Sequence, residues 1–319
     1  MIKSQEVVKT AFFGTSEFAV PALKYLIQNG YDIIAVVTQP EKPVGRTMTI
    51  MPSPIKKSAI ENNILVFEPH NLKNDDNFFK SFKHLNPDLC IVAAYGKIIP
   101  YQYLEIPRLG FINIHPSLLP KYRGPSPIQA AILNGDKETG VAIIKLDEEM
   151  DHGAILANHK SQIINYKYYK ELESELAEEG AKLLLDILPK YINGEIVLQE
   201  QDHSRATFTK ILTRHDGKID WNKSAQEIHN QICALNPEPG VWTTWQGKIL
   251  NIKNVGVSND NTKGDISSVV KLQNDVAVVT KKFYLVLREI QLEGGKEMDA
   301  KSFVNGHPEF IGSRLGGNS

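Results

Sequence analysis

Four short apolar runs near the start of the sequence constrain the fold more than any other feature. They span residues 7–13, 32–38, 88–96 and 110–115, and stretches with helical spacing separate them. Continuous apolar strands joined by helices are typical of a parallel sheet that is covered on both faces. The sequence therefore predicts an α/β domain with a mostly parallel sheet.

Two further elements are expected to complete this domain. Apolar runs on either side of the acidic turn 147–153 predict a hairpin over residues 141–160. A long amphipathic helix is predicted over residues 168–188, because its leucines recur on one face at helical spacing. Pro189 and Gly194 are expected to end that helix.

The last third of the chain has a different pattern. One helix, predicted over residues 225–235, is followed by several short strands at close spacing, which is typical of a small barrel. No clear period is visible between the two patterns. We therefore predict an α/β domain at 1–190, a linker at 191–208 and a barrel domain at 209–319.

Composition limits the classes of function. The formal net charge is −1, and residues 206–319 carry 14 Lys and Arg against 12 Asp and Glu, which excludes a broadly basic nucleic-acid coat. Cys90 and Cys233 each lie in an apolar segment, so we expect buried free thiols in a reducing compartment. The start lacks a signal-peptide core and no apolar run approaches ~18 residues. These features predict a cytoplasmic protein without a membrane partner.

The segment FINIHP places an amide and an imidazole at the end of an apolar strand. Side chains alternate along a strand, so Asn113 and His115 project to one face, and Pro116 ends the ladder there. Ligand crevices of open α/β sheets form at this carboxyl end. The two groups could donate hydrogen bonds to an oxygen that gains negative charge, or they could simply satisfy structural hydrogen bonds.

Other site chemistries lack their motifs. There is no GxSxG elbow, no HExxH spacing, and neither cysteine lies in a reactive motif, which disfavours the common hydrolytic schemes and a zinc site. There is also no GxxxxGK[ST] and no GxGxxG after the first strand. We expect no metal, no nucleoside triphosphate and no nicotinamide cofactor.

A longer segment identifies a family. NIHPSLLPKYRG, followed by GDKETGVAIIKLDEEMDHGAIL, closely resembles the signature of the folate-dependent formyltransferases, in which an Asp-x-Gly follows the histidine. Here Asp151 follows His115 by 36 residues. FFGTSEFAVPAL, VAAYGKIIP and the segment 218–252 resemble the branch that formylates methionyl initiator tRNA. A purine-pathway member should be much shorter and lack the barrel.

The resemblance implies a Rossmann-like formyltransferase domain and a C-terminal barrel similar to an OB fold, which would bind tRNA. It implies transfer of the formyl group of 10-formyltetrahydrofolate, as co-substrate, to the α-amino group of methionine on initiator tRNA. A monomer is the family expectation. Asn113 and protonated His115 would be the oxyanion donors, and Asp151 would stabilise the imidazolium and relay protons.

Binding residues also follow from the resemblance. The loop Ser117, Leu118, Leu119 and Pro120 would line the folate site. Lys121 and Arg123 lie beside the site, where phosphates of the acceptor end would pass, although solvated loop charges are an equal alternative. Arg46 matches an arginine of the family's tRNA-contacting insertion loop. Thr47, Met48 and Thr49 depart from the family there, because related proteins often carry lysines.

Trp242 and Trp245 could stack on bases, but their odd spacing in a strand predicts that at least one belongs to the core. Three other interpretations stay open: a formyltransferase acting on an amino sugar nucleotide, a formyl-folate hydrolase, and a non-catalytic RNA-binding protein. The second domain argues against the first two, and the intact set of Asn113, His115 and Asp151 argues against the third.

The position of Arg46 yields a first prediction. Arg46→Ala should raise the KM for charged tRNA more than the KM for the formyl folate, because it removes a cation that would face phosphate and not the folate. Steady-state kinetics with each substrate varied in turn measures this. An equal loss for both substrates would refute the assignment.

Overall fold

The computed structural model describes residues 7–44, 49–163, 168–260 and 262–317. The chain divides into two compact units. The first unit contains the described residues up to Pro127, together with 138–162 and 172–209; the second contains 128–137, 163–171 and the residues from 210 onward. The predicted linker 191–208 thus belongs to the first unit.

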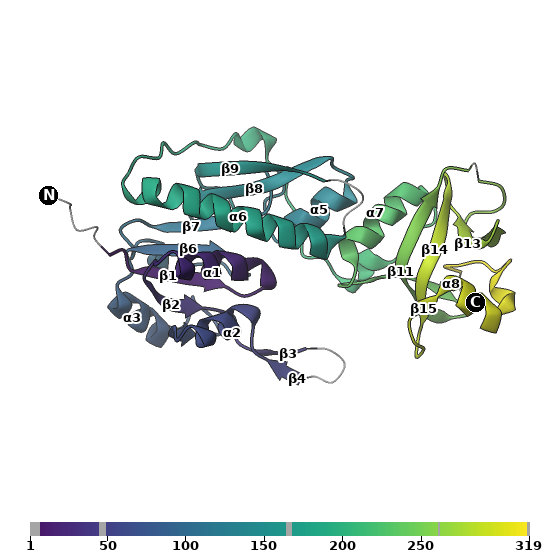
Figure 1. Ribbon diagram of the computed structural model, residues 1–319, viewed down its shortest axis with the longest axis horizontal. Coiled ribbons are helices and arrows are strands. Elements are labelled where there is room, and N and C mark those ends of the chain that lie inside the picture. Colours follow the sequence, from purple (N-terminus) through teal and green to yellow (C-terminus); the bar gives the residue numbers. More distant parts are fainter. Residues whose placement is uncertain (1–6, 45–48, 164–167, 261, 318–319) are drawn as a thin grey trace. The chain divides into compact units, whose positions relative to one another are not determined.

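The first unit contains a seven-stranded sheet in the order β5-β2-β1-β6-β7-β8-β9 (Figure 1). Its strands are β1 Thr10–Gly14, β2 Ile33–Val37, β5 Val66–Phe67, β6 Leu89–Ala93, β7 Phe111–His115, β8 Glu138–Lys145 and β9 Ile155–Gln162. The five strands from β5 to β7 are parallel, and β8 and β9 are antiparallel to their neighbours. The predicted mostly parallel sheet and its edge hairpin are therefore confirmed.

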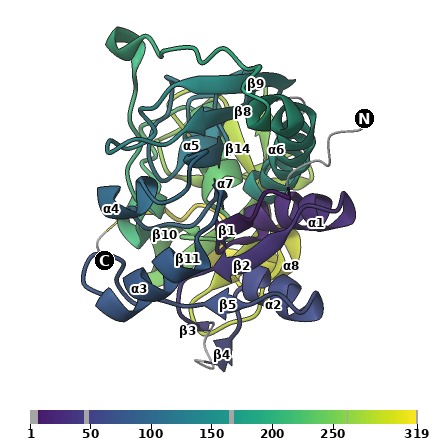
Figure 2. The same cartoon turned by 90° about the vertical axis from the view of Figure 1, so that its left-hand side faces the viewer.

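Helices cover both faces of this sheet. Figure 2 shows α1, α2 and α6 on one side and α3 and α4 on the other. The helices of this part of the chain are α1 Val20–Gln28, α2 Pro54–Glu61, α3 Asp76–Leu85, α4 Tyr101–Leu104, α5 Pro127–Leu133 and α6 Tyr169–Ile192. An aromatic cluster packs between the sheet and α3, where the Phe13 ring lies 5.7 Å from Phe82 and 5.3 Å from Phe111.

The end of α6 differs from the prediction. The helix passes through Pro189 and ends at Ile192, so Pro189 does not terminate it. Pro189 has no N–H to donate to the carbonyl four residues before it, but the three residues after it keep the helical conformation. Gly194 does follow the helix end, with a left-handed φ of +72° that glycine adopts without strain. The Glu195 N–H then closes the turn on the Lys190 carbonyl at 2.9 Å.

A two-stranded hairpin that the sequence did not predict lies between β2 and α2. Its strands are β3 Lys42–Val44 and β4 Thr49–Met51, which pair in antiparallel register. Arg46, predicted to contact tRNA, and its neighbours Thr47 and Met48 lie outside the described residues.

The second unit contains the predicted helix and strands. The predicted elements are α7 Ala225–Leu235, β10 Val241–Trp245, β11 Lys248–Ser258, β12 Val269–Leu272, β13 Asp275–Val279 and β14 Tyr284–Leu292. The short strand β15 Met298–Asp299 and the helix α8 Ala300–Gly306 follow them and were not predicted. The antiparallel order is β10-β11-β14-β13-β12, and β15 pairs with β14. The Ser224 side chain caps α7 by accepting a hydrogen bond from the Glu227 N–H, and Glu227 completes a capping box.

The C-terminal segment joins the two edges of this sheet. On one side, the Val269 N–H donates to the Ser313 carbonyl and the Leu315 N–H donates to that of Ser267. On the other side, the Gly316 N–H donates to Thr244 at the β10 edge. The apolar interior is thereby enclosed, and Leu315 is buried within it. This closure explains how a sheet with two open edges forms the predicted small barrel.

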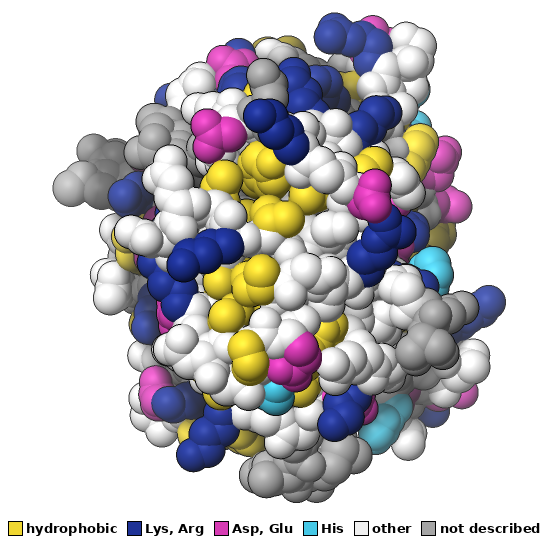
Figure 3. All heavy atoms as spheres, turned by 90° about the vertical axis from the view of Figure 1, so that its right-hand side faces the viewer, with side chains coloured by type: hydrophobic (Ala, Val, Ile, Leu, Met, Phe, Trp, Pro, Cys, Tyr) yellow, Lys and Arg dark blue, Asp and Glu magenta, His cyan; other side chains and the backbone are white. Residues whose placement is uncertain are grey.

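The surface of the second unit carries mixed charges. Figure 3 shows a band of hydrophobic side chains with Lys and Arg around it and single acidic side chains between them. This pattern agrees with the nearly neutral composition of residues 206–319.

Both cysteines are buried and neither forms a disulfide, as predicted. Burial raises the pKa of the Cys90 thiol well above its usual value, and burial raises the pKa of Cys233 to about 12. Both thiols therefore stay protonated and unreactive at neutral pH.

Membrane insertion by a helix finds no support in the described part of the chain. None of its helices combines the length and the apolar character that crossing a bilayer requires.

The barrel closure generates a stability prediction. Leu315→Ala should lower the free energy of unfolding of the second unit by about 2–4 kcal/mol, because it removes a buried side chain at the seam. Ile311→Ala is the control, since Ile311 lies in the same segment but is only half-buried. Chemical denaturation followed by tryptophan fluorescence measures the free energy of unfolding of both variants. Equal losses in the two variants would contradict a special role of Leu315 in closing the barrel.

Candidate active site

Asn113 and His115 lie on β7, in the interior of the sheet of the first unit. Asn113 is paired with Val92 on β6 and Ile144 on β8, so the strand is held on both sides. His115 is buried, while Asn113 is half-buried. The two side chains project to the same face at the carboxyl end of the strand, as the alternation of a strand requires.

Asp151 lies in the turn between β8 and β9 and faces this pair. Its Oδ1 atom is 3.5 Å from Asn113 Nδ2 and 3.5 Å from His115 Nδ1. Its other oxygen, Oδ2, accepts a hydrogen bond of 2.7 Å from the Gly124 N–H. The three polar side chains, which come from distant parts of the chain, therefore converge on one point.

Both ring nitrogens of His115 face hydrogen-bond acceptors. The Nε2 atom lies 3.1 Å from the Tyr122 carbonyl oxygen, which can only accept a hydrogen bond. The Nδ1 atom faces the Asp151 carboxylate. A ring N–H at either position could therefore donate to one of these groups, and an N–H on Nδ1 could also donate to a developing oxyanion.

The turn that carries Asp151 depends on a glycine. Asp151 has a φ of +50°, a left-handed conformation that aspartate tolerates better than most residues. Gly153 cannot carry a side chain, since a Cβ there would lie 1.8 Å from the Lys145 carbonyl oxygen. The Asp-x-Gly motif therefore has a structural reason as well as a chemical one.

The loop after β7 has its own internal contacts. Ser117 is buried and its hydroxyl donates to the Lys121 carbonyl at 2.6 Å. Leu119 packs in a small apolar cluster with Ala142, Ile144 and Ile155. Leu118 and Pro120 are half-buried, which leaves part of each accessible to a ligand. The predicted folate contacts of these four loop residues stay predictions.

The two predicted cations of this loop differ sharply. Lys121 is exposed, whereas Arg123 is only 3% exposed. The Arg123 guanidinium donates to Gln201 Oε1, at 3.2 Å from Nε and 2.7 Å from Nη2, and Nη2 also donates to His203 Nδ1 at 2.8 Å. The Arg123 guanidinium is therefore engaged within the first unit, and its predicted phosphate contact stays a prediction.

Gln201 is the residue that the sequence did not reveal. It is buried, and its Nε2 atom donates to the carbonyl oxygens of Asp151 at 2.9 Å and Gly153 at 2.8 Å. It lies in the predicted linker, outside every motif. A buried glutamine in an otherwise irregular, polar stretch carries no signal that sequence reasoning can use.

Two family models match the chain. Residues 8–188 match Formyl transferase, and residues 211–308 match Formyl transferase, C-terminal domain. The methionyl-tRNA formyltransferase of Methylacidiphilum infernorum (isolate V4) is 42% identical over 97% of this chain and 98% of that protein. That of Caldanaerobacter subterraneus subsp. tengcongensis is 40% identical over 94% of this chain and 97% of its own length. The chain belongs to the methionyl-tRNA formyltransferase family.

The fold is shared with solved formyltransferases. The N-formyltransferase from Helicobacter canadensis, in complex with folinic acid and dTDP-3-aminofucose, matches with a TM-score of 0.68 over 88% of this chain and 98% of that chain. The two sequences are 19% identical, so this likeness concerns the fold alone.

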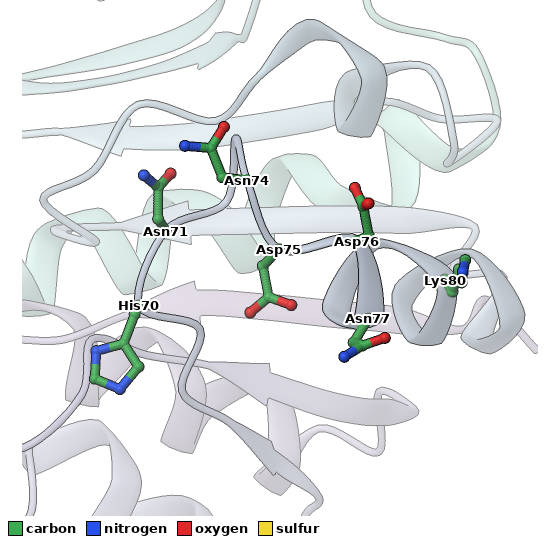
Figure 4. A pocket seen from close by; sticks show the side chains of 7 residues that line it. All are labelled: His70, Asn71, Asn74, Asp75, Asp76, Asn77 and Lys80. Atoms are coloured by element: carbon green, nitrogen blue, oxygen red, sulfur yellow. The ribbon is translucent and has the colours of Figure 1, made fainter.

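A polar pocket of the first unit is lined by other residues. Figure 4 shows a polar pocket at the start of α3, lined by His70, Asn71, Asn74, Asp75, Asp76, Asn77 and Lys80, none of which is a predicted site residue. Asp75 caps α3 there by accepting from the Phe78 N–H at 2.9 Å. Within the described parts of the chain, no group of three or more His, Cys, Asp or Glu could hold a metal ion.

The two tryptophans of β10 have different environments. Trp245 is buried against Phe303 and Phe310, which confirms that at least one of the pair belongs to the core. Trp242 is half-buried, with the Arg214 guanidinium 5.6 Å and the Lys218 amine 5.8 Å from its ring centre. A base-stacking role for Trp242 stays a prediction.

The Asp-x-Gly turn generates a prediction. Gly153→Ala should lower turnover at least about 100-fold, because the new Cβ displaces the backbone that carries Asp151 and a misplacement of about 1 Å can have this effect. Gly306→Ala is the control, since nothing lies within 4 Å of a Cβ there. Initial-rate measurements on both folded variants would decide; wild-type turnover in Gly153→Ala would contradict the role of the turn.

Proposed function

We propose that this protein transfers the formyl group of 10-formyltetrahydrofolate to the α-amino group of methionine on charged initiator tRNA, for translation initiation. The observation that carries the proposal is the convergence of Asn113, His115 and Asp151 at the carboxyl end of β7. Nearly full-length relatives named methionyl-tRNA formyltransferase, at about 40% identity, support this acceptor.

The reaction needs an uncharged amine and a polarised carbonyl. Free α-amino groups have pKa values of about 8, so a useful fraction of the methionyl amine is neutral at physiological pH. As its nitrogen bonds to the formyl carbon, the carbonyl oxygen becomes anionic. The Asn113 amide and the His115 imidazolium donate to this oxygen, and such preorganised donors each stabilise the transition state by about 3–4 kcal/mol.

One proton moves during the transfer. The amine nitrogen loses a proton when the new carbon–nitrogen bond forms, and the folate N10 gains one when its bond to the formyl carbon breaks. Asp151 accepts the first and, through water, delivers the second, so the site returns to its starting state. Its long contacts of 3.5 Å to Asn113 and His115 leave the donors free to engage a substrate oxygen.

We assign folate binding to the loop after β7, and tRNA binding to Lys121, Arg46 and the second domain. The folate site uses Ser117, Leu118, Leu119 and Pro120, and the complex of the Helicobacter canadensis enzyme with folinic acid supports a folate ligand in this fold. The tRNA contacts are Lys121, which is exposed, and Arg46. In this proposal residues 1–190 are catalytic, 191–208 link the domains and 209–319 bind tRNA.

The proposal also covers the metal requirement, the location and the oligomeric state. The reaction requires no metal, and the protein acts as a cytoplasmic monomer with no membrane partner. Incubation with 10-formyltetrahydrofolate and either charged initiator tRNA or an amino sugar nucleotide tests the acceptor. Formylation of the amino sugar nucleotide alone would refute the tRNA acceptor and indicate a sugar formyltransferase. Release of formate without an acceptor would indicate a hydrolase.

The catalytic assignment generates its own prediction. His115→Ala and Asp151→Ala should each lower kcat about 100- to 1000-fold, because the first removes a donor to the developing oxyanion and the second removes the group that carries the proton. His159→Ala and Asp186→Ala are matched controls, since both residues are exposed on the same unit. Rates near that of the wild type in folded His115→Ala or Asp151→Ala would remove the mechanism.

A further inference from the structure

One side chain, that of Gln201, forms hydrogen bonds to the backbone of the Asp151 turn. Gln201 Nε2 donates to two carbonyl oxygens, those of Asp151 and Gly153, at 2.9 and 2.8 Å. The two carbonyls lie on either side of His152, so the Gln201 amide bridges the first and last residues of the Asp-x-Gly turn. Asp151 has a left-handed φ of +50°, which costs some free energy in a residue other than glycine, and these two hydrogen bonds offset that cost.

Arg123 determines which way the Gln201 amide faces. Two guanidinium nitrogens donate to its Oε1, and no guanidinium nitrogen can accept. A flipped amide would place an NH₂ group against these donors and its oxygen against two carbonyl oxygens. Both residues are buried, so water does not compensate for such mismatches.

Arg123 also supports the other side of the carboxylate. Its backbone N–H donates to the Thr207 carbonyl at 2.9 Å, and its own carbonyl accepts from the Thr209 N–H at 2.8 Å. These contacts hold the loop in which the next residue, Gly124, donates to Asp151 Oδ2. One residue therefore connects the backbone clamp on Asp151 with the hydrogen bond to its carboxylate.

We propose that Arg123 and Gln201 form a positioning pair that aims the Asp151 carboxylate at Asn113 and His115. The pair acts through Asp151 and does not touch substrate. The inference rests on the proposed formyl transfer, since it assigns residues that support that reaction. It also gives Arg123 a role in turnover in place of tRNA binding.

The discriminating substitution is Gln201→Glu. The new carboxylate keeps an oxygen for Arg123, so a residue that only held Arg123 would be replaced without loss. Its second oxygen would face the two turn carbonyls and repel them, which displaces Asp151. We expect kcat to fall about 10- to 100-fold, with both KM values within about twofold of wild type. Gln199→Glu is the matched control, because Gln199 is exposed on the same segment.

A double-mutant cycle tests whether the effect passes through Asp151. In an Asp151→Asn background, which has already lost the carboxylate, Gln201→Glu should change the single-turnover rate by less than about twofold. A loss as large as that in the wild-type background would overturn the inference. So would wild-type kcat in folded Gln201→Glu.

Arg123→Lys is a second variant that tests the positioning pair if Gln201→Glu does not fold. It preserves the charge and removes the forked donors, so kcat should fall while the KM for tRNA stays unchanged. A raised KM for tRNA with unchanged kcat would restore the phosphate contact and overturn the pair. The wild-type protein is assayed alongside. If the wild type formylates no charged tRNA, the proposed function is wrong. If the wild type is active and the variants are as active as it is, only the positioning pair is refuted.

Discussion

The carboxylate of Asp151 is the constraint on which the site depends. It must approach an amide and an imidazole from a turn whose backbone is left-handed, and contacts from several segments hold it there. The Gly124 N–H holds one carboxylate oxygen, and the Gln201 amide holds the backbone carbonyl. Gly153 leaves the space that the turn needs beside Lys145.

Local periodicity made much of the fold predictable. The apolar strands of the first sheet and the strands of the barrel follow from alternation and turn residues, and the shared face of Asn113 and His115 follows from the geometry of a strand. The approach of Asp151 did not follow from periodicity. It came from resemblance to a family, because no local rule relates residues 36 positions apart.

The residues that sequence reasoning missed act over long distances in the chain. Gln201 meets Arg123 across 78 positions and Asp151 across 50, and neither contact belongs to a motif. Arg123 was expected to contact phosphate or to be a solvated loop charge, and both need an exposed side chain. Only the folded chain shows that this one is buried. The continuation of α6 through Pro189 could not be predicted from the sequence either, because a proline beyond the first turn usually ends or kinks a helix.

In the proposed reaction, Asn113 and His115 face the formyl oxygen, and Asp151 faces the two nitrogens between which the formyl group moves. A crystal structure of the protein with an unreactive analogue of 10-formyltetrahydrofolate tests this most directly. We expect the formyl oxygen at about 2.7–3.1 Å from both Asn113 Nδ2 and His115 Nδ1. A bound formyl group whose oxygen points away from both donors would contradict it.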